Sequence, residues 1–319
     1  MEKKKTSFGS SLLLALAAFI WGVAFVAQSV GMDYMGPCTF LGSRFLIGAA
    51  VLVPFIWFRD RNHKAEQEKH FDAQEALPIG QEVQGARKNS AEKKTLLTGG
   101  ICCGLALCSA SLLQQIGIQY TSVGKAGFIT TLYIILVPIF GIFLKKKIGK
   151  KVWTGAVIAV AGMYLLCVTE SFTISRGDFF VLLCAFVYAV HILVVDHFAP
   201  QTDSVKLSCI QFFVSGVIGM ILAFMFETPS FSALLAGAVP VLYAGVLSSG
   251  VAYTLQVVGQ KRVEPTVASM ILSMESVFSV LAGWLLLSQK LSVKELTGCV
   301  MVFAAVVMVQ LPDRKKQEI

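Results

Sequence analysis

The run FGSSLLLALAAFIWGVAFVAQSV, from Phe8 to Val30, decides the class of fold. These 23 residues carry no charge. As a helix they are long enough to cross the roughly 30 Å hydrocarbon core of a bilayer. Nine more apolar runs follow, and the chain of 319 residues is 55% hydrophobic and 14% charged, with a mean hydropathy of +0.72. A soluble protein of this length would carry more surface charge, so the sequence predicts a polytopic α-helical membrane protein.

The apolar runs predict an all-α integral membrane protein with ten transmembrane helices, arranged as two inverted five-helix repeats. A second copy placed behind an odd number of crossings must enter the bilayer in the opposite sense. The first repeat is expected at 1–58 and 95–170, the second at 171–312, and a cytoplasmic tail at 313–319. The ten segments are expected at 8–30, 37–58, 95–118, 122–144, 152–169, 178–195, 207–226, 234–257, 265–288 and 295–311.

The distribution of Lys and Arg predicts the orientation of these helices. With a cytoplasmic N-terminus and alternating sides, 22 of the 27 basic residues fall inside and 4 fall outside. Cytoplasmic loops carry an excess of Lys and Arg, so both termini are expected in the cytoplasm, with a bacterial-type inner membrane as the location. The stretch 59–94 mixes 8 basic with 7 acidic residues. It is expected to be a mobile cytoplasmic loop inserted in the first repeat.

Matching spacings support the internal repeat. Trp21 and Arg44 are 23 residues apart, as are Tyr188 and Gln211, which aligns helices 1–2 with helices 6–7 at an offset of 167. Further along the chain, the pair Thr154-Gly155 aligns with the pair Thr297-Gly298 at an offset of 143. The difference corresponds to the surplus length of the 59–94 stretch. Gly100 and Gly104, four residues apart, predict close approach of another helix.

Several motifs in order resemble the EamA type of the drug/metabolite transporter superfamily. They are AFIWGVAF around Trp21, Arg44-Phe-Leu, AGFITTLYIILVP from Ala126 to Pro138, and ESVFSVLAGWLLL from Glu275, followed by Leu291-Ser and Thr297-Gly298. The resemblance implies ten helices around a central cavity and movement of small metabolites such as amino acids, often outward. This chain has Glu275-Ser276 where the family often has Glu-Pro, and Ser288-Gln289 where it often has Gly-Glu.

Glu275 is the sharpest single candidate for function. It is expected near the middle of the ninth segment, where a carboxylate is costly and usually faces a cavity or a partner. A carboxyl group there could exchange a proton with the solute path. The alternative is a protonated acid that only bonds a neighbouring helix.

Arg44 is expected about seven residues into the second segment, in its outer half. One interpretation is an anchor in the outer vestibule for an anionic group such as a carboxylate. The other is a helix anchor that snorkels toward the surface or pairs with acids or carbonyls.

The other candidate residues are aromatic or carry amides. Such a set suits a small amphiphilic solute, although each member could equally be a bond between helices. His191 lies three residues after Tyr188 and could relay protons, but a lone His on an apolar helix is more often a packing residue. Together with Glu275 and Arg44, the predicted cavity residues are Trp21, Gln28, Gln114, Gln115, Tyr188, His191, Gln211, Tyr253 and Gln256.

No catalytic motif and no Cys or His spacing of a metal site occurs in the sequence, so no enzyme, metal or cofactor is expected. The net charge of +8 follows from charge asymmetry across the membrane and does not call for nucleic acid. The expected partners are a small-molecule solute and the lipid bilayer, with protons as a candidate coupling ion. We expect a secondary active transporter, an exporter of small organic metabolites by alternating access. The alternative is a passive facilitator or channel.

Overall fold

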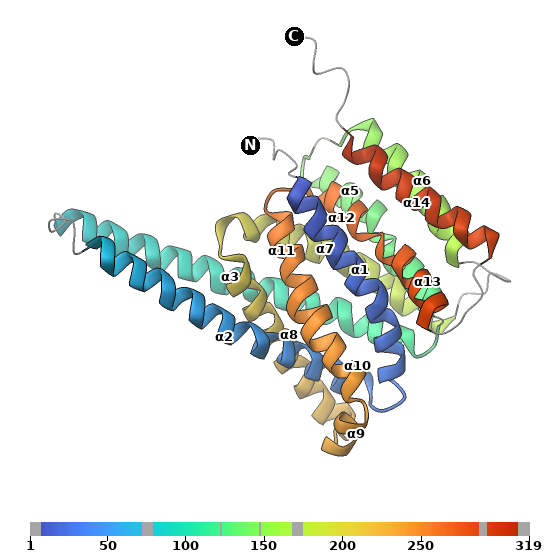
Figure 1. Cartoon of the computed structure of the whole chain (residues 1–319), viewed down its shortest axis with the longest axis horizontal. Helices are drawn as coiled ribbons and strands as arrows, with labels where there is room; N and C mark the ends of the chain where they lie inside the picture. The colour runs from blue at the N-terminus through green and yellow to red at the C-terminus, as the bar shows by residue number, and fades with distance from the viewer. Residues whose placement is uncertain are drawn as a thin grey trace, which may run out of the picture.

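The computed structural model of the chain describes residues 8–71, 79–121, 123–146, 148–167, 175–286 and 292–311, without the side chains of 63–89, 125, 166, 167, 283 and 295. The expected tail at 313–319 and the pair Ser288-Gln289 lie outside the described residues. Every regular element in the described ranges is a helix (Figure 1).

The helices follow one another without a strand between them in the described ranges. They are α1 Phe8–Gly31, α2 Pro37–Phe71, α3 Ile79–Ile118, α4 Val123–Thr131, α5 Tyr133–Phe143, α6 Lys150–Cys167, α7 Arg176–Phe198, η1 Ala199–Gln201, α8 Ser204–Phe226, α9 Phe231–Ala236, α10 Ala238–Leu242, η2 Tyr243–Tyr253, α11 Thr254–Gln260, α12 Pro265–Leu272, α13 Glu275–Leu286 and α14 Val293–Gln310.

Eight helical stretches of the described residues are long and apolar enough to cross a membrane. They are Phe8–Gly31, Pro37–Asn62, Ser90–Ile118, Ala126–Phe143, Arg176–Gln201, Ser204–Phe226, Ala238–Gln260 and Pro265–Leu286, and a shorter apolar helix covers Leu296–Gln310. Many of their large apolar side chains are exposed on the outside of the bundle, as lipid-facing residues are. The prediction of an all-α membrane protein is confirmed. Ten crossings and their inversion stay predictions.

The stretch 59–94, expected to be a mobile cytoplasmic loop, is helical in its described backbone. α2 continues to Phe71 and α3 begins at Ile79, so the two helices extend beyond the apolar bundle as a long hairpin (Figure 1). The physical reason lies in composition, because Ala, Glu, Gln, Lys and Arg all have high helix propensity. A polar helix needs no core to be regular, and charge alone does not predict disorder.

Three predicted continuous segments are interrupted in the structure. The segment 122–144 is divided at Leu132 into α4 and α5, and 265–288 is divided at Ser273 and Met274 into α12 and α13. The segment 234–257 becomes α10, the π-helix η2 and α11. Glu275 is therefore the first residue of a helix and does not lie in the middle of one.

The bundle is held by close pairs of helices. α2 packs along α8, α3 along α7 and α8, α6 along α14, and α1 along α13 and η2. A Cβ at Gly100 would lie 2.4 Å from Ile210 Cγ2, and one at Gly104 would lie 2.7 Å from Val214 Cβ. The close approach predicted for these two glycines is confirmed, with α8 as the partner helix.

Ion pairs gather at one end of the bundle. They join the polar end of α2 to the start of α8 and the ends of α5 and α7 to each other, through Arg59–Asp203 at 2.8 Å, Lys206–Asp60 at 2.6 Å and Lys146–Asp196 at 2.6 Å. Their side chains range from partly buried to exposed, and surface pairs of this kind are worth about 0–1 kcal/mol each. These pairs are informative because the helix ends that they join are the ones that the predicted alternating topology places on the cytoplasmic side.

At the opposite end of α2, a carboxylate from another helix caps the helix start. Glu227, which follows the last residue of α8, accepts hydrogen bonds from the backbone N–H groups of Cys38 at 2.7 Å and Thr39 at 2.8 Å. The Thr39 hydroxyl donates to the same carboxylate at 2.6 Å. An anion at a helix N-terminus satisfies orphan donors and complements the helix dipole.

We expect Glu227→Ala to lower the free energy of unfolding by about 1–2 kcal/mol, because it leaves these donors without their acceptor. The loss should appear as a lower midpoint of thermal unfolding in detergent. Asp33→Ala serves as the control, since Asp33 is an exposed acid in the neighbouring α1–α2 turn. Equal melting temperatures for the two variants would contradict the role of Glu227 as a cap.

Candidate functional site

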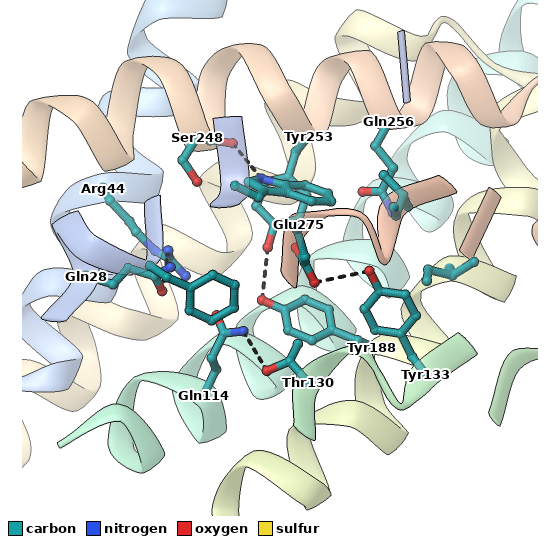
Figure 2. Close-up of a pocket in the computed structure, with 14 residues that line it drawn as sticks. Gln28, Arg44, Gln114, Thr130, Tyr133, Tyr188, Ser248, Tyr253, Gln256 and Glu275 are labelled. Atoms are coloured by element: carbon teal, nitrogen blue, oxygen red, sulfur yellow. Dashed lines mark hydrogen bonds between the residues drawn. The ribbon is translucent and has the colours of Figure 1, made fainter. Parts of the chain in front are cut away.

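A small cavity lies inside the bundle, where α1, α2, α3, α7 and η2 meet the breaks between α4 and α5 and between α12 and α13 (Figure 2). Its volume is about 30 Å³, space for about two water molecules. The cavity is lined by Trp21, Phe25, Gln28, Arg44, Gln114, Thr130, Tyr133, Tyr188, Ile192, Ser248, Tyr253, Gln256, Leu272 and Glu275.

Glu275 enters the cavity from the break between α12 and α13. Its side chain is 5% exposed, and its Oε1 accepts a hydrogen bond from the Tyr133 hydroxyl at 3.1 Å. Tyr133 begins α5, directly after the break in the other interrupted helix. Because Glu275 is the first residue of α13, its carboxyl group lies near the positive end of a helix dipole.

A cluster of hydroxyl groups forms the wall beside Glu275. The Tyr188 hydroxyl lies 3.0 Å from Ser111 Oγ and 2.9 Å from the Tyr253 hydroxyl. The Trp21 ring packs on Tyr253 with centroids 4.5 Å apart. The cavity therefore combines aromatic faces with hydroxyl groups that can donate or accept.

The π-helix η2 explains how residues five apart reach the same cavity. In an α-helix, positions i and i+5 point roughly 140° apart. In a π-helix these positions are neighbours, because the hydrogen bonds run from i to i+5. Ser248 and Tyr253 accordingly both border the cavity, and the Ser248 carbonyl accepts a hydrogen bond from Trp21 Nε1 at 3.2 Å.

Arg44 faces the cavity from α2 and is 1% exposed. Its Nη1 donates to Gln28 Oε1 at 3.1 Å, and its guanidinium lies 4.7 Å from the centre of the Phe45 ring. The interpretation that Arg44 snorkels toward the surface is wrong, because the guanidinium is buried. The rings of Phe40 and Phe45 cover the guanidinium, so Arg44 and Glu275 share one cavity.

The structure brings eight of the eleven predicted residues together at the cavity. Three others lie elsewhere: Gln115 donates to the Gln28 carbonyl at 3.3 Å, and His191 Nε2 lies 3.2 Å from Gln211 Oε1. Only one of the adjacent pair 114–115 can face inward, and Gln114 does so, donating to Thr130 Oγ1 at 3.1 Å. The eight residues at the cavity are Glu275, Arg44, Trp21, Gln28, Gln114, Tyr188, Tyr253 and Gln256.

The sequence reasoning missed six lining residues as candidates. Thr130 and Tyr133 flank the break in the fourth segment. They belong to the motif AGFITTLYIILVP, and this membership is the sequence feature that could have identified them. Phe25 shares a helical stripe with Trp21 and Gln28. The other missed residues are Ile192, Ser248 and Leu272. Within the described ranges, no group of three or more His, Cys, Asp or Glu side chains could hold a metal ion.

Known proteins resemble this chain over most of its length. An uncharacterized transporter of Archaeoglobus fulgidus is 26% identical over 303 residues, which cover 95% of this chain and 86% of that protein. The uncharacterized transporter YoaV of Bacillus subtilis is 22% identical, over 91% of this chain and 92% of its own. A chloroplastic WAT1-related protein of Arabidopsis thaliana is 22% identical over 92% of this chain and 68% of that protein.

A solved crystal structure shares the fold, with a TM-score of 0.74 at 16% identity over 98% of this chain and 100% of that chain. The family model described as the EamA-like transporter family matches residues 9–168 and again residues 175–311. These two matches contain all the cavity residues described above. The chain therefore belongs to the EamA-like transporter family and is a multi-pass membrane protein of a transporter family.

Proposed function

We propose that the protein is a secondary active transporter that exports small organic metabolites or amphiphilic compounds across a bacterial-type inner membrane. Two inverted five-helix repeats, 1–58 with 95–170 and 171–312, enclose the cavity and expose it to each side in turn. Glu275 binds a polar group of the solute or carries a coupled proton. The observation that carries this proposal is the meeting of two equivalent helix breaks at the cavity.

The backbone at the two breaks supports the repeat. The N–H of Leu132 bonds the Ile129 carbonyl at 3.2 Å, and the N–H of Met274 bonds the Ile271 carbonyl at 3.2 Å. Both bonds span three residues instead of four, and they lie 142 positions apart in the chain (132 to 274). This offset differs by one from the offset that aligns Thr154 with Thr297.

The side chains at the breaks follow the same offset. The Thr131 hydroxyl donates to the Phe128 carbonyl at 2.9 Å, and the Ser273 hydroxyl donates to the Met270 carbonyl at 2.7 Å. A hydroxyl that bonds back to a carbonyl of the preceding turn competes with the helical ladder and bends it. A hydroxyl bonded back to the preceding turn thus accompanies the break at matching places in both halves.

Tyr133 and Glu275 occupy equivalent positions of the two halves and touch each other. Equivalent residues of two copies can meet only close to the axis that relates the copies. Broken helices at the interface of inverted repeats are the usual site of solute and ion binding in secondary transporters. The Tyr133–Glu275 hydrogen bond is therefore a candidate for the centre of the transport site.

The packing of whole helices is consistent with the same symmetry. α2 pairs with its counterpart α8, and α6 pairs with its counterpart α14. α3 contacts α7, and the counterparts of these helices, η2 and α1, also contact each other. Likewise, α1 contacts α13, and the counterpart of α1, α7, contacts α4 and α5. A cavity of only about 30 Å³ also favours a carrier over a channel, which needs a continuous lining.

Transport by purified protein tests this function. Liposomes containing the protein would be loaded with a defined mixture of amino acids, organic acids, nucleosides and amines, and the solutes lost would be compared with those lost from protein-free liposomes. We expect at least one solute to leave with saturable kinetics and to be stimulated by the same solute on the other side. Unsaturable flux without counterflow would instead support the passive facilitator or channel.

Reporter fusions test the inverted topology. A reporter that works only in the cytoplasm should be active at both chain ends, and one that works only outside should be inactive at both. A reporter inserted at residue 75, between α2 and α3, should report the cytoplasmic side, and one in the α3–α4 turn near Tyr120 the outer side. Ends on different sides would refute the ten-crossing arrangement, whatever the flux measurements give.

A further inference from the structure

Arg44 is a buried cation that the protein itself leaves partly unpaired. Among the described residues that line the cavity, it is the only one with a positive charge, and its side chain is 1% exposed. One nitrogen, Nη1, has a partner in Gln28, while Nε and Nη2 have none. No ion pair to an acid is formed by Arg44 within the described part of the chain.

The two unpaired nitrogens lie on the same edge of the guanidinium. Nη1 is the nitrogen cis to Cδ, so the N–H of Nε and one N–H of Nη2 point in parallel away from it. This edge matches the two oxygens of a carboxylate and can donate two parallel hydrogen bonds to them. Gln28 occupies the other edge and orients the plane, while the Phe45 ring lies 4.7 Å from the guanidinium carbon.

A buried guanidinium without a counter-charge is costly at membrane depth, and such residues usually mark a substrate or ion pathway. Glu275 borders the same cavity but is bonded to Tyr133 and makes no ion pair with Arg44. The cost is recovered when an anion from outside the protein occupies the free edge.

We propose that Arg44 binds the carboxylate of a monoanionic organic solute. In a state of the protein that opens this cavity of about 30 Å³ wider, the apolar body of that solute would lie against the aromatic wall of Trp21, Phe25 and Tyr253. A dianion such as a phosphate ester would need a second cation, and the described lining residues supply an acid instead. As an assignment of the transported solute, this rests on the function proposed above.

Binding to the full-length protein in lipid nanodiscs tests the site with matched pairs of probes. The probes are phenylacetate with phenylacetamide, 3-phenylpropionate with 3-phenylpropionamide, and 4-methylpentanoate with 4-methylpentanamide, and phenylphosphonate serves as the dianion. We expect at least one carboxylate to bind about tenfold or more tightly than its amide, since hydrogen bonds to charged groups are the stronger ones. Phenylphosphonate should bind more weakly than phenylacetate.

Variants assign the preference to the guanidinium. Arg44→Gln should remove the difference between each carboxylate and its amide, and Arg44→Lys should reduce it because the parallel donors are lost. Gln28→Glu keeps the shape of the site but places an anion beside Arg44, so it should weaken carboxylate binding about tenfold even if Arg44→Gln fails to fold. Arg59→Gln, at the polar end of the same helix, should leave all affinities unchanged.

The site is refuted if no carboxylate binds better than its amide, or if the preference survives in both Arg44→Gln and Gln28→Glu. Flux measurements separate this outcome from failure of the transporter proposal. Saturable transport of neutral or cationic solutes that does not change in the Arg44 variants would refute the carboxylate site and support the transporter proposal. Carboxylate binding that depends on Arg44, without any flux of solute, would support the carboxylate site and refute the transporter proposal.

Discussion

Glu275→Gln is expected to abolish transport driven by a proton gradient while the protein still folds. In the wild type, the Tyr133 hydroxyl donates a hydrogen bond to Glu275 Oε1 at 3.1 Å. Glutamine has the same shape, and its Oε1 can still accept this hydrogen bond. It cannot release a proton, so any coupling that passes through this position is lost. Gradient-driven accumulation in proteoliposomes should fall at least about tenfold, equivalent to ~1.4 kcal/mol or more, whereas exchange of solute across the membrane without a gradient should continue.

The control for this experiment is Glu264→Gln, which changes an exposed acid at the start of α12, the helix that leads to the break. It should leave gradient-driven accumulation at the wild-type level. A Glu275→Gln protein whose transport kept the pH dependence of the wild type would exclude proton coupling at this residue. Glu275 would then be left with a role in binding or packing.

Gly22→Val is expected to have the largest effect on stability. A Cβ at Gly22 would lie 2.4 Å from Phe278 Cβ and 2.8 Å from both the Phe278 carbonyl carbon and the Ser279 nitrogen. Backbone atoms cannot rotate away, so α1 and α13 must separate along their contact. Overpacking of this kind costs about 1–3 kcal/mol and occasionally more, and two branched methyl groups place valine at the upper end. The midpoint of thermal unfolding and the yield of monodisperse protein should both drop.

Gly124→Val provides the comparison, since a Cβ at Gly124 would have no heavy atom within 4 Å. Any loss there measures only the lower helix propensity of valine or its effect in the unfolded chain. Gly22→Ala should fall between the two, because it adds the clashing Cβ without the branches. A Gly22→Val protein as stable as Gly124→Val would show that α1 and α13 are not in contact as described.

Much of the helix layout follows from the sequence because each membrane helix must satisfy its own backbone and meet lipid with apolar side chains. The breaks were not predictable from that rule. Neither Leu132 nor Ser273-Met274 involves glycine or proline, so the usual signals are absent. The one local hint is a hydroxyl residue at each break, Thr131 directly before Leu132 and Ser273 directly before Met274. Most such residues in membrane helices cause no break.

The burial of Arg44 in the bundle could also not be predicted from the sequence alone. Counting residues from the helix start gives its distance along the axis but not which face of α2 meets the bundle. The burial of the guanidinium depends on Phe40 and Phe45 from its own helix and on Gln28 from α1. Tertiary packing decided this outcome. The polar hairpin of α2 and α3 shows the converse, because there local propensity decided the structure without a core.

The π-helix η2 makes the number of residues in this stretch a determinant of which side chains line the cavity. Deleting a single residue between Tyr243 and Leu247 would let this stretch wind as an ordinary α-helix, and each position beyond it would turn by about 100°. Ser248 and Tyr253 could then no longer border the cavity together. Insertions and deletions here would therefore change which side chains line the cavity even when no side chain is exchanged.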